Sequence, residues 1–168
     1  MRIVHLARRF VRALWPGRPR AADVEWVESV LTPAELTLWR RLPNHDRRYS
    51  IRVARRVEQL LSGTAYAPDS RWIAVALLHD VGKLDSALGV VPRALATVAG
   101  AVRPATRRSA GRFGRYLRHD EIGGEILRAG GARDEAARWA ATHHHRERWP
   151  ATGIPAPVAA ALDAADNA

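Results

Sequence analysis

The sequence predicts an all-α fold. Apolar residues recur at helical spacing through most of the 168-residue chain, and no segment shows the sustained two-residue alternation that marks a strand. Proline and glycine separate the helical stretches, among other places at Pro16-Gly17, Pro43, Gly89, Pro104 and Gly130-Gly131. Because 47% of the residues are hydrophobic, a chain of this length can bury the core of one domain without disulfides.

The N-terminal region, residues 1–43, is expected to add helices to that core. Residues 1–20 are basic, and the apolar residues among them fall along one side of a helix: Ile3, Leu6, Ala7, Phe10, Val11 and Leu14. Such a helix either docks on its own domain or lies on a membrane surface. We therefore expect a basic N-terminal helix and lead-in helices packed on the core, followed by the main helical domain at residues 44–168.

One lead-in helix has a clear start in the stretch "TPAELTLWRRL". Thr32 is a candidate N-cap, Pro33 takes the first helical position, and Glu35 stands where a capping box needs an acidic or amide side chain. The sequence therefore predicts that a helix begins at Pro33.

The next helices are predicted from their apolar faces. Residues 45–61 place Ile51, Ala54, Val57, Leu60 and Leu61 on one face with arginines opposite, and this helix should end near Ser62-Gly63. Residues 72–78 are apolar nearly all round, which predicts a central helix enclosed by the others. Residues 101–115 mix proline, glycine and arginine, so we expect either a loop with a helical turn or a mobile lid.

Composition restricts the chemistry. The chain has no cysteine, so a metal would have to be held by His, Asp or Glu. The formal charge of +10 favours anionic ligands, but no motif that reads nucleic acid accompanies it, and we do not expect a nucleic-acid partner. No segment approaches the roughly 18 consecutive apolar residues of a membrane span. Arginines interrupt what would be the apolar region of a signal peptide, which predicts a cytoplasmic protein.

The enclosed helix ends in a polar cluster, "HDVGK". Burying the Asp80 carboxylate is costly without a partner, and a metal ion shared with His79 would supply one. Gly82 allows close backbone approach, and Lys83 extends a cation toward the same place, where it could hold a phosphate oxygen. The alternative is that His79 is a satisfied helix-end histidine and Asp80 a helix cap.

Other helix ends carry similar side chains. His119 precedes an apolar helical stretch, His143, His144 and His145 end another, and Asp163 and Asp166 end the chain's last helix. Imidazoles mixed with carboxylates suit zinc, manganese or iron, and two such ions could share a bridging aspartate.

The stretch "ALLHDVGK" resembles the central motif of the HD-domain superfamily of metal-dependent phosphohydrolases, and the resemblance extends over residues 45–168. It implies a compact helical bundle of the HD-domain type, to which residues 1–43 add an N-terminal helical segment. It also implies one or two divalent ions (Mn, Fe, Co, Zn or Mg), one of them held by His79, Asp80 and Asp166. Lys83 would help to bind the phosphate of a phosphoester substrate.

Two further stretches are similar to the branch of that superfamily that hydrolyses cyclic dinucleotides. "HDEIGGEILR" and "HHHRERWPATGIP" imply His119, His144 and His145 as ligands of a second ion. The Asp-Gly and Gly-Tyr-Pro of that branch are here Pro150-Ala151 and Gly153-Ile154-Pro155, and Arg146 stands where a paired histidine is usual. These departures argue against a cyclic dinucleotide as the substrate.

A departure upstream concerns the first ion. Members of the superfamily carry a metal-binding histidine where this chain has Tyr49, and His45 lies about one helical turn earlier. Three outcomes remain open: a one-ion site that lacks this ligand, a site completed by His45 or His119, or a site without metal.

The sequence thus predicts a hydrolase that cleaves a nucleotide or another small phosphoester by a metal-activated water. Asp80 and Lys83 would be catalytic, and Lys83, Tyr49 and Arg52 would contact the substrate. The alternative is a catalytically degenerate HD-type domain that senses a nucleotide or anion, or that binds another protein. Association into a homo-oligomer is left open.

Overall fold

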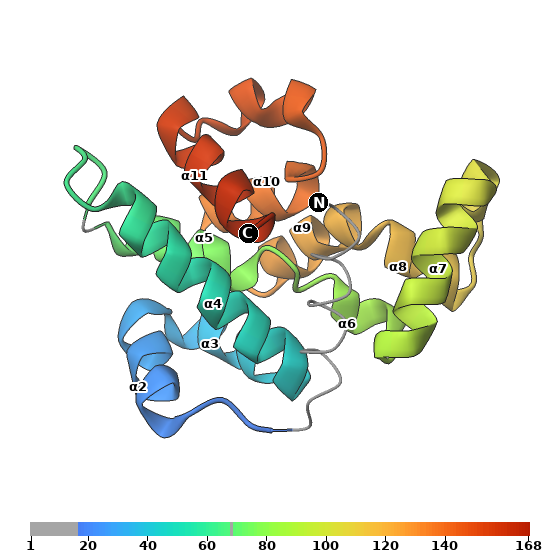
Figure 1. Ribbon diagram of the computed structural model, residues 1–168, viewed down its shortest axis with the longest axis horizontal. Coiled ribbons are helices and arrows are strands. Elements are labelled where there is room, and N and C mark those ends of the chain that lie inside the picture. The colour runs from blue at the N-terminus through green and yellow to red at the C-terminus, as the bar shows by residue number, and fades with distance from the viewer. Residues whose placement is uncertain (1–16, 68) are drawn as a thin grey trace.

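A computed structural model describes residues 17–67 and 69–168, and it confirms the predicted all-α fold: this part of the chain contains helices and no strand (Figure 1). The basic helix predicted at the N-terminus falls almost entirely on residues 1–16, outside the described residues. The helices, with η for 3-10 helices, are α2 (Ala21–Val30), α3 (Pro33–Arg40), α4 (Asn44–Leu61), α5 (Ser70–Leu78), α6 (Lys83–Ser86), α7 (Val90–Val102), η1 (Pro104–Arg108), α8 (Arg112–Leu117), α9 (His119–Ala129), α10 (Asp134–Thr142), η2 (Arg146–Thr152) and α11 (Ala156–Asp166).

Helix α5 lies at the centre of the fold, as its all-round apolar sequence predicts. Every residue from Trp72 to Leu78 is buried. Its N-terminus is capped by Asp69, whose carboxylate accepts a hydrogen bond from the amide of Arg71 at 2.9 Å. Neighbours α4 and α10 both pack on α5, and α11 in turn packs on α4. The end of α5 at Leu78 is therefore surrounded by other helices.

Helix α4 has the predicted amphipathic character. Ile51, Ala54, Val57 and Leu61 are buried, and the helix ends at Leu61, next to the predicted stop. Residues of α2 and α3 add to the same core, notably Val27, Leu38 and Trp39. Among the described helices, none is long and apolar enough to cross a membrane.

Residues 101–115 form a loop with helical turns, one of the two predicted arrangements. They run from the end of α7 through η1 into the first half of α8. In Figure 1, α7 and α8 pack against each other and extend to the side of the central helices. A buried ion pair connects this lateral unit to α4, because Arg93 of α7 donates to both oxygens of Asp46 at 2.7 and 2.8 Å.

The capping box predicted at the start of α3 is present, and it extends into a buried ion pair. Glu35 accepts from the amide of Thr32 at 3.0 Å, and the Thr32 hydroxyl accepts from the amide of Glu35. The Arg133 guanidinium donates to both Glu35 oxygens at 2.7 and 2.8 Å. Burial alone would raise the pKa of Glu35, but these hydrogen bonds outweigh it and lower the pKa below its usual value.

We expect Glu35→Ala to destabilise the fold by about 3 kcal/mol at neutral pH, because it leaves the partly buried Arg133 without its partner. The folded pKa of Glu35 is lowered, so its stabilising contribution is present above the unfolded pKa and is lost as the pH falls through the folded pKa. Urea unfolding should therefore show a smaller difference between wild type and variant in acid. Thr32→Ala, which removes only the cap, should cost about 1 kcal/mol. Equal losses in the two variants would contradict this account.

Candidate metal centre

The polar ends of five helices, α5, α6, α9, α10 and α11, meet at one pocket of about 350 Å³. Its walls carry His79, Asp80, Lys83, His119, His143, His144 and Asp166, together with apolar residues such as Val53, Trp139 and Leu162. The three residues on which the sequence-based metal site depends do converge: Nε2 of His79 lies 3.4 Å from Oδ2 of Asp80 and 3.3 Å from Oδ1 of Asp166.

Helix termination determines how three of the histidines are oriented. Nδ1 of His79, His119 and His143 lies 2.8, 2.8 and 2.9 Å from a carbonyl oxygen three residues earlier, in the last turn of α5, α8 and α10 respectively. These carbonyls lack an intrahelical partner, and a carbonyl only accepts, so each Nδ1 carries a proton and donates it. In a neutral ring, Nε2 then presents its lone pair to the pocket, as it does in many metal-binding histidines.

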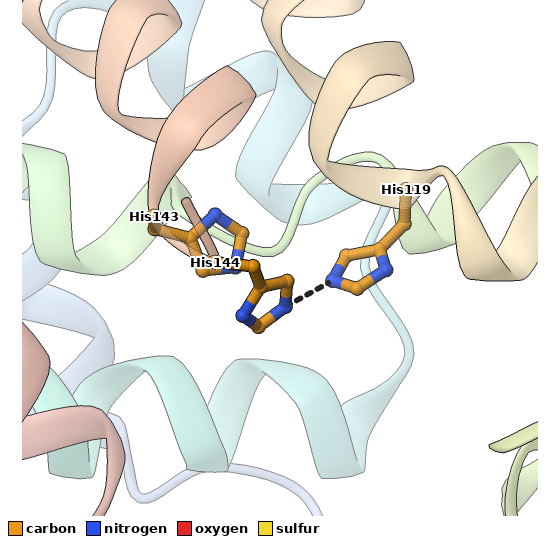
Figure 2. A group of neighbouring side chains, drawn as sticks. All are labelled: His119, His143 and His144. Carbon is orange, nitrogen blue, oxygen red and sulfur yellow. Dashed lines mark hydrogen bonds between the residues drawn. The ribbon is translucent and has the colours of Figure 1, made fainter. Parts of the chain in front are cut away.

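Three imidazoles form the densest donor group among the described residues. The candidate ligand atoms of His119, His143 and His144 all lie within 4.8 Å of one another. Figure 2 shows the rings turned toward each other, His119 from the start of α9 and the other two from the end of α10. Nε2 of His144 is 3.3 Å from Nε2 of His119.

Asp80 joins this imidazole group to the pair formed by His79 and Asp166. Its Oδ1 lies 3.3 Å from Nε2 of His119 and 4.0 Å from Nε2 of His143, whereas its Oδ2 faces His79. Lys83, one turn further along the chain, donates to Oδ2. The two oxygens of one carboxylate therefore face two different candidate ion positions.

On the His79 side, carboxylate oxygens already accept hydrogen bonds from other residues of the chain. Tyr49 donates its hydroxyl to Oδ1 of Asp166 at 2.5 Å, and Lys83 occupies Oδ2 of Asp80. Burial lowers the pKa of His79, but the carboxylates of Asp80 and Asp166 outweigh burial and raise it to about 10. Burial likewise opposes ionisation of Asp80, yet Lys83 and His79 hold its pKa well below the usual value.

On the other side, two of the imidazoles, those of His143 and His144, are neutral near neutral pH. Burial, reinforced by the neighbouring histidines, lowers the pKa of His143 to about 3. Burial and the nearby His119 lower the pKa of His144 to about 4. Neutral imidazoles are the form that binds a metal ion, so these two residues do not have to lose a proton near neutral pH.

The donor set fits a divalent ion. Nitrogen ligands about 2.1 Å from a tetrahedrally coordinated ion lie about 3.4 Å from one another. The 3.3 Å separations of His119 from His144 and from Asp80 Oδ1 match that spacing. Moreover, Nε2 of His143 is buried and makes no hydrogen bond with any described residue, which is costly unless a ligand compensates.

A glycine brings the end of α5 against the start of α9. A Cβ on Gly82 would lie 1.8 Å from the carbonyl oxygen of His119 and 2.6 Å from the amide nitrogen of Gly123. The sequence-based expectation that Gly82 allows close backbone approach is confirmed. This contact holds Asp80 and His119 within reach of each other.

We expect Gly82→Ala to destabilise the fold by about 3 kcal/mol, because α9 must move away to accommodate the methyl group. The matched control is Gly111→Ala: Gly111 has a negative φ and no atom within 4 Å of an added Cβ. Chemical unfolding should show the control within about 0.5 kcal/mol of wild type. Similar stability of the two variants would show that the close contact is not needed.

The structure places three other predicted site residues outside the imidazole group. His45 lies beside Arg93, 3.2 Å from its guanidinium, and beside Asp46. His145 points to Asp120, with Nε2 at 3.1 Å from Oδ2, because the chain turns after α10. Arg52 is exposed and its guanidinium stacks over the Tyr49 ring, 5.0 Å from the centroid. None of the three lines the pocket. Tyr49 does not line it either, but it donates its hydroxyl to Asp166, which does.

Two residues that the sequence did not assign to the site do line the pocket. His143 directly follows the last residue of α10, just as His79 directly follows the last residue of α5, and this shared position is the signal that could have identified it. Arg107 of η1 donates to both oxygens of the buried Asp120 at 3.0 Å. No pattern in the surrounding arginine-rich loop distinguishes Arg107.

The fold and the site thus define a helical domain with imidazole and carboxylate donors suited to a divalent metal ion. A family model described as HD domain matches residues 49–168. The match covers well over half of the chain, so the chain belongs to the HD domain family. The match is to the family as a whole and does not identify the cyclic-dinucleotide branch. No curated protein and no solved structure matches the chain.

Proposed function

We propose that this HD domain is a metal-dependent phosphohydrolase that cleaves a nucleotide or another small phosphoester. The observation that carries the proposal is the convergence of one ionised carboxylate, Asp80, with the imidazoles of His119, His143 and His144 on one pocket wall. Membership of a family whose members typically bind divalent metals supports it. A pocket of about 350 Å³ suits a small substrate. The cytoplasmic location expected from the sequence stays a prediction.

We further propose that a single ion binds between Oδ1 of Asp80 and the three imidazoles. The other position, beside His79, is less suitable because Oδ1 of Asp166 and Oδ2 of Asp80 already accept hydrogen bonds from Tyr49 and Lys83. Three imidazoles with one carboxylate favour Zn, Mn, Fe or Co over Mg, which prefers oxygen ligands. This site also holds one ion, but at another position than the one-ion outcome left open by the sequence, which placed the ion at His79, Asp80 and Asp166 without a ligand at position 49.

The chain's own residues would bind and orient the substrate. A divalent ion at this place would polarise a phosphoryl oxygen and activate water. Lys83 and Arg107 are the cations of the pocket wall, and both could hold the remaining phosphate oxygens. Arg107 uses its Nη2 for Asp120, and a guanidinium carries further N–H donors for a ligand. His79, protonated between Asp80 and Asp166, keeps both carboxylates ionised and fixed in position.

Metal analysis of protein purified without a histidine tag tests the ion site. After loading with Mn²⁺ or Zn²⁺ and desalting, we expect about one ion per chain, and loss of that ion in His143→Ala. His45→Ala is the matched control and should retain the ion, since His45 lies with Arg93 and Asp46. Equal occupancy in wild type and His143→Ala would contradict the proposed position.

The residue at position 49 should determine how many metal ions the protein binds. We expect Tyr49→His to bind a second ion, because it adds an imidazole beside His79 and Asp166 and removes the phenol from Asp166. Tyr49→Phe removes the same hydrogen bond without adding a ligand, so its ion content should stay at that of wild type. A wild-type protein that already binds two ions would rule out the one-ion site.

Hydrolysis is tested with chromogenic phosphomonoesters and phosphodiesters and with a panel of nucleotides. Activity should require the added divalent ion. Asp80→Ala should lower kcat/KM by at least about 100-fold, because it removes the one carboxylate ligand of the proposed ion. Lys83→Gln should mainly raise KM, since it removes a phosphate contact. Undiminished activity in Asp80→Ala would exclude this site. A protein that binds the ion but cleaves no phosphoester would favour a degenerate domain that senses an anion.

A further inference from the structure

One helix exposes an apolar face that no described element covers. On α7, Val91, Leu95, Val98 and Val102 are 51%, 57%, 61% and 74% exposed, and they are the exposed large hydrophobic residues of the described part of the chain. They occupy positions i, i+4, i+7 and i+11, which places them along one side of the helix. We call these four residues the α7 stripe. An exposed patch of this kind marks an interaction site more often than isolated apolar residues do.

The opposite side of α7 is anchored to the domain. Ala96 and Arg93 are buried, and Arg93 donates to both oxygens of Asp46 on α4. Arg93 is also the only charged residue between Val90 and Val102, so the outward side of the helix carries no charge. The α7 stripe therefore lies on the outer side of a helix whose opposite side is fixed to the domain.

The segment that carries the α7 stripe is rich in arginine. Between Ala87 and Arg118 the chain has no Asp or Glu, and its charged residues are Arg93, Arg103, Arg107, Arg108, Arg112, Arg115 and Arg118. Arg103 and Arg108 are exposed and form no ion pair with a described residue. Arg112 donates to the carbonyl oxygens of Ser86 and Ala87, which leaves its charge uncompensated. The lateral unit of α7, η1 and α8 thus combines an apolar stripe with unpaired positive charge.

This combination favours an anionic lipid surface over a second copy of the chain. A stable protein interface buries roughly 800 Å² on each partner, more than four side chains of one 13-residue helix supply. Pairing two copies through α7 would also bring two arginine-rich units together. A bilayer with acidic headgroups accepts the apolar side chains at its interface and attracts the arginines. We propose that the α7 stripe docks this protein reversibly on an anionic membrane surface.

Docking through α7 would place the pocket close to the membrane. Thr97 of α7, Arg107 of η1 and Tyr116 and Leu117 of α8 line the pocket, so the same unit carries the lipid-facing stripe and one pocket wall. The proposal does not depend on the bound metal or on hydrolysis.

Vesicle co-sedimentation of the full chain tests the proposal. Wild type should sediment with phosphatidylcholine vesicles that contain phosphatidylglycerol and not with phosphatidylcholine alone, and added salt should weaken binding. Leu95→Ser/Val98→Ser should lower the affinity at least about tenfold, because two apolar anchors are lost. Ala21→Ser/Ala22→Ser, at exposed positions of α2, is the matched control and should bind as wild type does.

Two further variants keep the outcomes separable. Arg103→Gln/Arg108→Gln should weaken vesicle binding and reduce the salt dependence of that binding. Circular dichroism shows whether the serine variant folds; if it does not, the arginine variant is used in its place to test membrane binding. Asp80→Ala should still bind vesicles, so failure of the hydrolase proposal leaves this one intact. Wild type that binds neither vesicle type, or both equally, would overturn it. So would unchanged binding of the serine variant, or a wild-type dimer that this variant dissociates in sedimentation equilibrium.

Discussion

The site depends on one buried carboxylate that serves two groups of side chains. Asp80 is 5% exposed, and burying a charge is expensive unless partners surround it. Its Oδ1 faces His119 and His143, and its Oδ2 faces His79 and Lys83. The ends of α5 and α10 and the starts of α6 and α9 therefore converge on a single group. Loss of any of these contacts would leave the charge less well compensated, so packing and electrostatics support the same arrangement.

Termination of the helices explains how three histidines are oriented in the pocket. The last turn of a helix leaves carbonyl oxygens without a partner, and His79, His119 and His143 each satisfy one of them through Nδ1. The same bond fixes the ring orientation and leaves Nε2 directed at the pocket. Two of these residues at helix boundaries, His119 and His143, are also ligands of the ion site that we propose. Local backbone chemistry and the function we propose are therefore linked through a single hydrogen bond at each position.

Local sequence signals were sufficient for most of the fold. The capping box at Thr32, the amphipathic face of α4 and the enclosed α5 follow from spacing and composition, because nearest neighbours along a helix determine them. The convergence of His79, Asp80 and Asp166 followed from the family resemblance. Which histidine of residues 143–145 faces the pocket did not follow, because it depends on how the chain turns after α10. The sequence also could not predict that the apolar side of α7 is exposed, because the same spacing of apolar residues occurs in a helix that buries that side.

The charges around His79 explain why the ion should prefer the imidazole side. Protonated His79 and Lys83 balance the carboxylates of Asp80 and Asp166, so this half of the site is neutral without a metal. A divalent ion placed there would have to displace the proton of His79 and compete with the Lys83 ammonium and the Tyr49 hydroxyl. On the other side, His143 and His144 are uncharged, so neither of these two ligands has to lose a proton. Tyr49 in place of a histidine thus favours one ion, and it leaves Lys83 and Arg107 as the fixed positive charges that an anionic substrate would meet.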